Sequence, residues 1–350
     1  MNILNDKALF ASLVLGAETV DFTHEGAYLD RYVPAEKEGC LANGRHPVRI
    51  DFTAGMRLSF VTDSKSLMLG ATICNESELK DCTAIDVKAN GKYIGSIANF
   101  TEDGRALFPD GTVKEAEPRN YPLGRYYKEF PLGEGEKTVT IYLTYSAKTL
   151  ITELSLEDGA SVRPSRPKLR HLIYGDSITH GYNASHPSHT YIARLDDFLD
   201  AESFHKGIDG GTYFAPIAAA AVRRDYDLVT VAYGTNDWDR VPFDEFSKQA
   251  SEFLSILASR YPTARIYVLT PTWRADNQPK QRPHGTVEDY RDFLAAACDK
   301  HPNMRVIHCV DFIPHDPAMF GDERLHPSDE GFAHYAKGLI EAIKKDFKKM

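Results

Sequence analysis

The sequence predicts an N-terminal β-sandwich followed by a three-layer α/β/α domain with a parallel sheet. Three observations carry this prediction. The first half holds many short runs of alternating or β-branched residues, the second half alternates strand-like runs with amphipathic helices, and a proline-containing segment separates them. A length of 350 residues is enough for two hydrophobic cores.

The first half shows β patterning with turn residues between the runs. Asn90-Gly91 lies between two β-rich runs and is a strong signal for a tight hairpin. Many short strands of this kind favour a sandwich of jelly-roll type. The clearest strands are predicted over residues 48–52, 57–61 and 138–143.

Residues 158–167 contain two prolines and a glycine and show no periodicity, which indicates a domain boundary. We therefore expect one domain over residues 1–162 and a second over residues 168–350. The apolar stretch 8–17 lacks the charge pattern of a signal peptide and is interpreted as a short buried helix or strand.

The second half predicts a parallel sheet covered by helices on both faces, because its strand-like runs are almost continuously apolar. Strands are expected over 169–174, 202–206, 227–233, 264–269 and 304–310. Helical spacing of apolar residues is found over 191–199, 246–257 and 332–347. Ser328 is the expected N-cap of the last helix.

Composition restricts the possible partners. Lys and Arg number 41 and Asp and Glu 50, so the formal charge is −9, which argues against nucleic acid or an anionic membrane as the main partner. No run approaches the about 20 apolar residues of a membrane span. Five cysteines without a CxxC pair favour a reduced, cytoplasmic setting. The oligomeric state is left open, and a homo-oligomer is possible.

Polar residues follow the predicted strands at the carboxyl edge of the sheet, where α/β proteins bind ligands. Ser177 follows the first strand, and His326 precedes the last helix. A serine needs an adjacent base to become a nucleophile, and a neutral histidine suits that task. A carboxylate must orient the histidine, and both Glu323 and Asp322 are close enough in sequence to do so.

The same edge offers donors for the negative charge that develops during acyl transfer. The backbone N–H groups of Ser177 and Gly207 and the side-chain amide of Asn236 could together bind an oxyanion. Alone, each of these residues is better explained as a turn or cap residue. Their occurrence in order at successive strand ends favours catalysis.

These segments resemble the four sequence blocks of the SGNH hydrolases, also called the GDSL esterase and lipase family. The blocks are Gly175-Asp176-Ser177-Ile178-Thr179, Gly207, Gly234-Thr235-Asn236-Asp237 and His326-Pro327. The resemblance implies a flavodoxin-like catalytic domain with Ser177 as nucleophile, His326 as base, and Gly207 and Asn236 in the oxyanion hole. It also implies that no cofactor or metal is needed.

The chain departs from the family pattern at two positions. The family usually has an aspartate three residues before the histidine, where this chain has Glu323, with Asp322 one residue further back. Position 205, often asparagine in the family, is His205, and its role is unassigned. The β-rich first half is similar in layout to that of two-domain acetyl-xylan esterases.

Several other residues near the strand ends have competing explanations. Asp176 is interpreted as a turn-holding residue. His180 is expected to line the mouth of the site, and a metal site formed by it with His186 and His189 is disfavoured because their spacing crosses a loop.

Two tryptophans follow strand ends in the second half. Trp238 and Trp273 could either pack beneath loops or offer platforms to a substrate, with the two explanations evenly balanced. Arg274, beside the second tryptophan, is interpreted as an exposed charge with a minor chance of contacting substrate.

The sequence thus predicts a serine esterase that forms an acyl-enzyme, with a small-molecule or oligosaccharide ester as substrate. Resemblance to the two-domain esterases favours removal of acetyl groups from carbohydrates. Acyl transfer to an alcohol, and lipase, thioesterase or lysophospholipase activity, remain as alternatives because the same site serves them all. A non-catalytic carbohydrate-binding protein is the alternative outside the enzymes.

Overall fold

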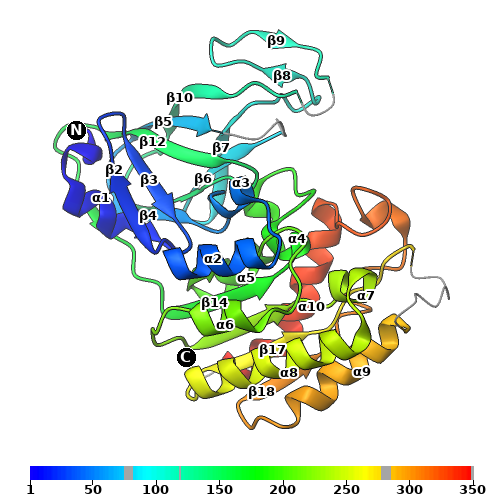
Figure 1. Ribbon diagram of the computed structural model, residues 1–350. Coiled ribbons are helices and arrows are strands. Elements are labelled where there is room, and N and C mark those ends of the chain that lie inside the picture. Colours follow the sequence, from blue (N-terminus) through cyan, green and yellow to red (C-terminus); the bar gives the residue numbers. More distant parts are fainter. Residues whose placement is uncertain (75–81, 118–119, 277–284, 348–350) are drawn as a thin grey trace. The chain divides into compact units, whose positions relative to one another are not determined.

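The computed structural model describes residues 1–74, 82–117, 120–276 and 285–347 (Figure 1). The chain forms two compact units. The first contains residues 1–31, 51–166 and 185–188, and the second contains residues 32–50, 167–184 and 189–350.

These units differ from the two continuous domains expected from the sequence. Residues 32–50 pack with the second unit although they come from the N-terminal part of the chain, and residues 185–188 pack with the first. In the first unit the carboxylate of Asp86 accepts hydrogen bonds from the His186 ring at 2.7 Å and from the Ser188 amide at 3.0 Å.

The first unit is a β-sandwich of two antiparallel sheets. Both sheets contribute buried side chains to one core, for example Phe60 and Ile141 from one and Leu69 and Phe130 from the other. One sheet has the order β1 (Val14–Leu15), β4 (Arg57–Thr62), β11 (Lys137–Tyr142), β6 (Ala84–Ala89) and β7 (Lys92–Ala98), with β13 (Val162–Pro164) also pairing β4. The other has the order β10 (Gly124–Pro131), β5 (Ser66–Cys74), β12 (Lys148–Leu156), β3 (Ala27–Asp30) and β2 (Thr19–Phe22).

The turn residues Asn90 and Gly91 correctly predicted a hairpin in this unit. β6 and β7 form the expected hairpin, and Asn90 and Gly91 both have positive φ, at 48° and 75°, as the tight turn requires. A short ribbon of β8 (Ala106–Leu107) and β9 (Val113–Lys114) lies outside the two main sheets.

The apolar stretch near the N-terminus contains a short helix, but this helix is buried on one side only and is exposed on the other. Residues Ile3–Asn5 form the short helix η1, and α1 (Lys7–Leu13) follows it. The side chain of Asp6 caps α1 by accepting a hydrogen bond from the Leu9 amide at 3.0 Å. Phe10 and Leu13 are buried in the sandwich core.

The predicted strand over residues 48–52 is wrong, because α3 (Pro47–Ile50) is helical. Proline is well suited to the first position of a helix, and the segment has no strand partner. Ile50 is buried in the core of the second unit, so an apolar side chain here does not indicate a sheet face.

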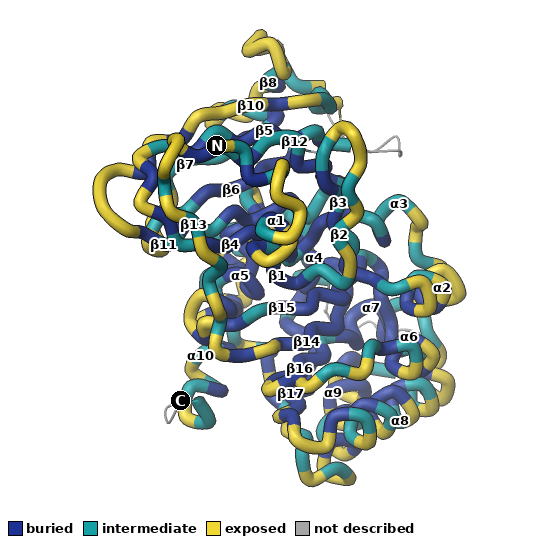
Figure 2. The backbone as a smooth tube through the Cα atoms, turned by 90° about the vertical axis from the view of Figure 1, so that its left-hand side faces the viewer, coloured by how far each residue is buried: buried dark blue, intermediate teal, exposed yellow. Residues whose placement is uncertain are grey.

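The second unit contains a fully parallel sheet in the flavodoxin-like order, as the sequence predicted. Its strands are β15 (Ala201–His205), β14 (Leu169–Gly175), β16 (Leu228–Ala232), β17 (Arg265–Leu269) and β18 (Met304–Ile307), in that order. Figure 2 shows β14 and β16 as mostly buried strands between covering helices.

Helices cover both faces of this sheet (Figure 1). On one face lie α6 (Ala215–Ala220), α8 (Phe243–Arg260) and α9 (Val287–Cys298), and on the other α5 (Tyr191–Leu199) and α10 (Asp329–Phe347). The shorter helices are α2 (Pro34–Ala42), α4 (Ser177–His180), α7 (Thr235–Arg240), η2 (Pro187–His189) and η3 (Pro317–Met319). Ser328 caps α10 as expected, since its hydroxyl accepts from the Gly331 amide at 3.3 Å.

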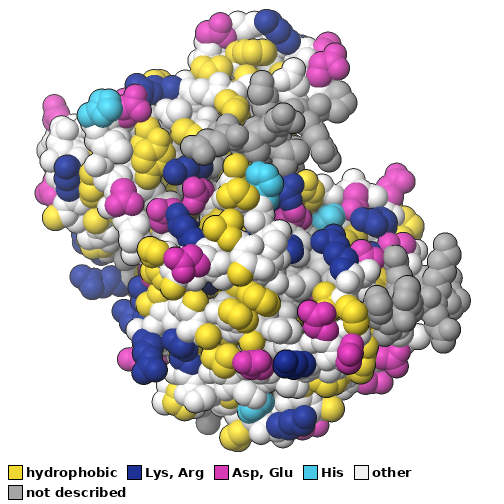
Figure 3. Space-filling model, in the orientation of Figure 1, with side chains coloured by type: hydrophobic (Ala, Val, Ile, Leu, Met, Phe, Trp, Pro, Cys, Tyr) yellow, Lys and Arg dark blue, Asp and Glu magenta, His cyan; other side chains and the backbone are white. Residues whose placement is uncertain are grey.

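The surface carries a mixture of charges. Figure 3 shows acidic and basic side chains interspersed over each unit on the face drawn. Among the residues that the structure describes, no helix is both long and apolar enough to cross a lipid bilayer.

Phe253 on α8 is the centre of an aromatic cluster under the sheet. Its ring makes edge contacts with Tyr174, Tyr213 and Tyr233 at centroid distances of 5.3, 5.6 and 5.8 Å. We expect Phe253→Ala to lower the free energy of unfolding by about 3–5 kcal/mol, because it leaves a cavity among rings that cannot close it. Chemical denaturation measures this, with Phe198→Ala, at a 51% exposed position, as a control expected to change stability by about 0.5 kcal/mol or less.

Candidate active site

The turn after β14 presents Ser177 at the carboxyl edge of the parallel sheet. Asp176 caps α4 by accepting a hydrogen bond from the Ile178 amide at 3.0 Å, so Ser177 is the first residue of that helix. Gly175 allows the tight turn, because a Cβ at this position would collide with the Thr179 side chain. Gly175 and Asp176 therefore each have a structural reason, and together they place Ser177 at the start of α4.

Ser177, His326 and Asp322 form a continuous hydrogen-bonded chain. The Ser177 Oγ lies 2.8 Å from His326 Nε2, and His326 Nδ1 lies 2.8 Å from Asp322 Oδ2. A carboxylate only accepts hydrogen bonds, so Nδ1 carries the ring hydrogen and Nε2 is left to accept from the serine hydroxyl. Ser177 is 2% exposed, and the His326 side chain is 15% exposed.

The loop before α10 decides which acid faces the histidine. Asp322 Oδ1 accepts from the amides of Arg324, Leu325 and His326, at 3.1, 2.8 and 3.0 Å, which directs its second oxygen to the ring. Glu323 has a φ of 54° and an exposed side chain. Of the two acids left open by the sequence, the structure thus brings Asp322 to His326.

Hydrogen bonding also keeps Asp322 ionised. Burial by itself would raise the pKa of this carboxyl group. The hydrogen bond from the His326 ring, together with those from the Leu325 and His326 amides, outweighs that effect and holds the pKa well below its ordinary value. The group next to the histidine is therefore a carboxylate throughout the neutral pH range.

Gly207 lies beside the Ser177 turn because the pairing of β15 with β14 continues past the end of the strand. The Lys206 amide donates to Ile173 O at 2.7 Å, and the Ile208 amide donates to Gly175 O at 3.0 Å. A Cβ at position 207 would lie 2.6 Å from the Thr179 Cγ2 atom. Only glycine fits without displacing α4.

Asn236 is connected to the same loop from the other side. It lies in α7, which begins after Gly234 at a φ of 120°. Its side-chain amide donates to Gly211 O at 3.0 Å, and the Gly211 amide donates to Ile208 O at 3.0 Å. The structure therefore brings together Ser177, Gly207 and Asn236, three residues that the sequence places at successive strand ends.

Two further acids beneath the site are fully buried. Burial raises the pKa of Asp176 to about 6 and that of Asp237 to about 7. Asp237 Oδ1 accepts from the Tyr213 amide at 3.0 Å, whereas Oδ2 has no hydrogen-bond partner among the described residues. Their places under the turns agree with a structural role for both.

Two of the residues suggested for substrate contact are buried. His180 is 4% exposed, and its Nδ1 accepts from the Asp209 amide at 3.2 Å. Trp238 is 2% exposed and donates to Gly285 O at 3.3 Å, so it packs beneath a loop and offers no platform. Trp238 belongs to the buried hydrophobic core of the second unit.

Trp273 is only partly buried. Its ring stacks on His315 with centroids 5.2 Å apart and contacts Phe320 at 5.4 Å. Phe320 lies two residues before Asp322, so this aromatic group borders the loop of the histidine. Of the three suggested substrate residues, it is the one with an accessible side chain.

Arg274 is a residue that sequence reasoning misjudged, because it is 1% exposed and not a surface charge. It forms a two-pronged ion pair with Asp276 at 2.7 and 2.8 Å, and donates to Thr235 O and Oγ1 at 3.2 and 3.1 Å. Its guanidinium also lies 4.8 Å from the Trp238 ring centroid. Arg274 thereby anchors the start of α7. An arginine that follows a strand does not by itself indicate in the sequence that it will be buried.

The three histidines after Ser177 do not converge. His186 pairs with Asp86 in the first unit, whereas His189 Nδ1 lies 3.0 Å from Asp329 in the second. Within the described ranges, no group of three or more His, Cys, Asp and Glu side chains could hold a metal ion.

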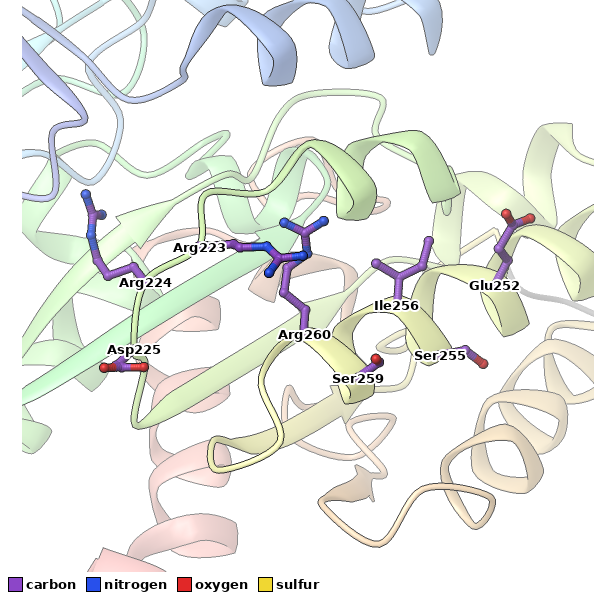
Figure 4. Close-up of a pocket in the computed structure, with 8 residues that line it drawn as sticks. All are labelled: Arg223, Arg224, Asp225, Glu252, Ser255, Ile256, Ser259 and Arg260. Carbon is purple, nitrogen blue, oxygen red and sulfur yellow. The ribbon is translucent and has the colours of Figure 1, made fainter.

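A cavity of about 620 Å³ lies at the opposite, amino edge of the sheet, before β16 (Figure 4). Two of its three arginines have partners within the second unit. Arg260 donates to Ala221 O at 2.6 Å and Ala219 O at 2.7 Å, and Arg224 lies 4.0 Å from the Phe204 ring centroid. None of the residues discussed above as catalytic lines it.

A parallel flavodoxin-like sheet with a serine, a histidine and an aspartate linked at its carboxyl edge defines a serine hydrolase of the SGNH type. Comparison with known families agrees. Residues 173–334 match the model of the GDSL-like lipase/acylhydrolase family. Residues 173–334 therefore form a domain of this family.

Solved structures show that the whole two-part fold recurs elsewhere. A salicylyl-acyltransferase, SsfX3, from a tetracycline biosynthetic pathway has a TM-score of 0.70 at 19% identity, with 95% of this chain and 94% of that chain covered. A family two carbohydrate esterase from Clostridium thermocellum has a TM-score of 0.63 at 12% identity, with 96% of this chain and 100% of that chain covered. The acetyl xylan esterase Est2A from Butyrivibrio proteoclasticus has a TM-score of 0.60 at 12% identity, covering 99% and 98%. No curated protein matches the chain by sequence.

The buried carboxyl group of Asp237 predicts a pH dependence of stability. Burial raises its pKa to about 7, so the native state favours the neutral carboxyl group. The neutral group contributes to the free energy of unfolding in full below about pH 4, and this stabilising contribution is lost as the pH rises through 7. Asp237→Asn cannot ionise. We expect the free energy of unfolding of the variant to increase relative to wild type between pH 4 and pH 8, as measured by denaturation at each pH. A difference that stays constant over this range would contradict the assignment.

Proposed function

We propose that the protein is a serine esterase that works through an acyl-enzyme. The observation that carries the proposal is the hydrogen-bonded chain from Ser177 through His326 to Asp322. His326 Nε2 takes the hydroxyl proton while Ser177 Oγ attacks the ester carbonyl carbon. Asp322 holds the histidine in the tautomer that can accept this proton and stabilises the imidazolium that forms.

The negative charge on the former carbonyl oxygen is held by fixed donors. These are the backbone N–H groups of Ser177 and Gly207 and the side-chain amide of Asn236. When the intermediate collapses, His326 returns the proton to the departing alcohol. Water then attacks the acyl carbon while His326 takes one of its protons, and His326 returns that proton to Ser177 Oγ as the bond between Oγ and the acyl carbon breaks and the carboxylic acid departs.

Short acyl groups on carbohydrates are the proposed substrates, with acetyl first. The proposal is supported by the arrangement of a sandwich and a hydrolase unit in one chain, which is also found in the carbohydrate esterases compared above. Trp273, which stacks on His315 and packs on the buried Phe320, presents a partly exposed aromatic ring next to the Asp322 loop, and such a ring suits the flat apolar face of a sugar.

Acyl transfer to an alcohol is the second candidate. It uses the same acyl-enzyme and differs only in whether water or another hydroxyl attacks it. The similarity in fold to a salicylyl-acyltransferase is the reason to test it. An added alcohol that diverts the acyl group from water into a new ester would identify this activity.

Replacing the nucleophile tests the proposed chemistry. We expect Ser177→Ala to lower the turnover of 4-nitrophenyl acetate at least about a thousandfold, because no other hydroxyl is hydrogen-bonded to His326 among the described contacts. Release of acetate from acetylated xylan, acetylated mannan and simple acetylated sugars is measured with the same pair of proteins. Ser247→Ala, a hydroxyl on α8 that binds Phe243 O, is the matched control. Equal rates for Ser177→Ala and wild type would refute the catalytic role.

The two neighbouring acids can be separated by isosteric substitution. We expect Asp322→Asn to reduce kcat/KM by about a thousandfold or more, because an amide facing Nδ1 favours the wrong tautomer of His326. Glu323→Gln should stay within about threefold of wild type. If both variants keep the wild-type rate, a backbone carbonyl or water orients the histidine and the proposed role of Asp322 is wrong.

A further inference from the structure

Residues 32–50, here called the N-terminal strap, contact the loop that carries Gly207. The strap contains α2 and α3 and belongs to the second unit, although residues on both sides of it belong to the first. Its contacts fall on both sides of Gly207. Tyr32 and Glu36 bind Lys206, Arg45 and Arg49 bind Asp209, and Asn43 donates to Thr212 Oγ1 at 3.1 Å.

One of these contacts falls on the peptide group that contains the Gly207 N–H. The Tyr32 hydroxyl donates to Lys206 O at 3.0 Å, and Tyr32 is 2% exposed. The carbonyl of Lys206 and the N–H of Gly207 belong to the same planar peptide, which is trans. In a trans peptide these two bonds point in opposite directions, so fixing the carbonyl on one side fixes the direction of the N–H on the other.

The hydrogen bonds between the flanking backbone and β14 do not act directly on this peptide group. The Lys206 and Ile208 amides are held by β14, but they belong to the neighbouring peptide groups. A peptide next to glycine meets little steric resistance to rotation. The hydrogen bond to the Lys206 carbonyl therefore supplies a restraint that the sheet pairing leaves out, and it also polarises the peptide toward a stronger N–H donor.

Tyr32 is in turn held rigidly by its surroundings. Lys206 Nζ lies 2.7 Å from Glu36 and 5.2 Å from the Tyr32 ring centroid, and the Lys206 and Glu36 side chains are both 1% exposed. Glu36 also accepts from the Val33 amide at 3.0 Å. The same lysine is thus bound through its side chain and its carbonyl by one turn of the strap.

We propose that Tyr32 is a positioning residue that orients the Gly207 N–H toward the oxyanion. This inference rests on the proposed esterase function and names a role for a residue outside the four sequence blocks. Its consequence is that part of the N-terminal half of the chain acts on the chemical step. The effect should appear in kcat, because the oxyanion forms during the reaction and is absent from the bound ester.

Tyr32→Phe tests the proposal, because it removes the hydroxyl and keeps the ring. We expect kcat for 4-nitrophenyl acetate to fall about tenfold, less than the loss for deleting a donor, with KM within about twofold of wild type. The pH midpoint of kcat/KM should stay unchanged, since His326 and Asp322 are untouched. As a second measurement, inactivation by diethyl 4-nitrophenyl phosphate should slow by a similar factor, because its phosphoryl oxygen occupies the same hole.

Tyr261→Phe is the matched control. Tyr261 is also buried in the second unit, and its hydroxyl donates to Val222 O at 2.9 Å, at the amino edge of the sheet. Both variants should lose a similar amount of thermal stability, whereas only Tyr32→Phe should lose kcat. Equal kcat values for the two variants, or a rise in KM with unchanged kcat in Tyr32→Phe, would overturn the role of Tyr32 and leave the proposed esterase function standing. A wild type without Ser177-dependent turnover would overturn the proposed function and this inference with it.

Discussion

The close packing of Thr179 against two strand ends is the constraint on which the site depends. A Cβ at Gly175 would collide with the Thr179 side chain, and a Cβ at Gly207 would lie 2.6 Å from it. Because both positions lack a side chain, α4 can sit directly on the ends of β14 and β15. The Thr179 hydroxyl is held in turn by Tyr191 on α5, at 2.9 Å. This packing sets Ser177 and Gly207 side by side before any charged group is considered.

Electrostatics divides the carboxyl groups of the site into two kinds. Asp176 and Asp237 are fully buried under the turns, and desolvation raises the pKa of each. Asp322 is partly exposed and receives hydrogen bonds from the His326 ring and three amides, and its pKa is lowered. The first two are suited to holding backbone, and only the third is suited to stabilising a positive imidazolium.

The N-terminal strap shows why a linear division of the chain is incomplete. Prolines and a change of periodicity mark the passage near residue 166, and the compact units do divide there. The earlier excursion over residues 32–50 also contains prolines, at positions 34 and 47, but the sequence neighbours of Tyr32 and Glu36 do not assign these residues to the second unit. Their partner Lys206 is about half the chain away, so only folding reveals the contact.

The sequence by itself determined the local features of this protein. The hairpin at Asn90-Gly91 needs positive φ at both residues, and the apolar runs of the second half allow little but a parallel sheet covered on both faces. The positions of Ser177, Gly207 and Asn236 after successive strands, and of His326 before the last helix, were enough to predict that they meet at one edge. Each of these predictions depends on short-range geometry or on the periodicity of neighbouring residues.

Tertiary structure decided what the residue types left open. Asp322 and Glu323 are adjacent and chemically alike, and the choice between them follows from the backbone conformation before α10, in which the amides of residues 324–326 hold Asp322 and direct its second oxygen to the ring. Arg274 and Trp238 are buried because other segments of the chain pack over them. Likewise, residues 48–52 suggested a strand, but Pro47–Ile50 form a helix whose Ile50 packs in the core of the second unit. A side chain's neighbours in space are set by packing of the whole chain, and local sequence contains no record of them.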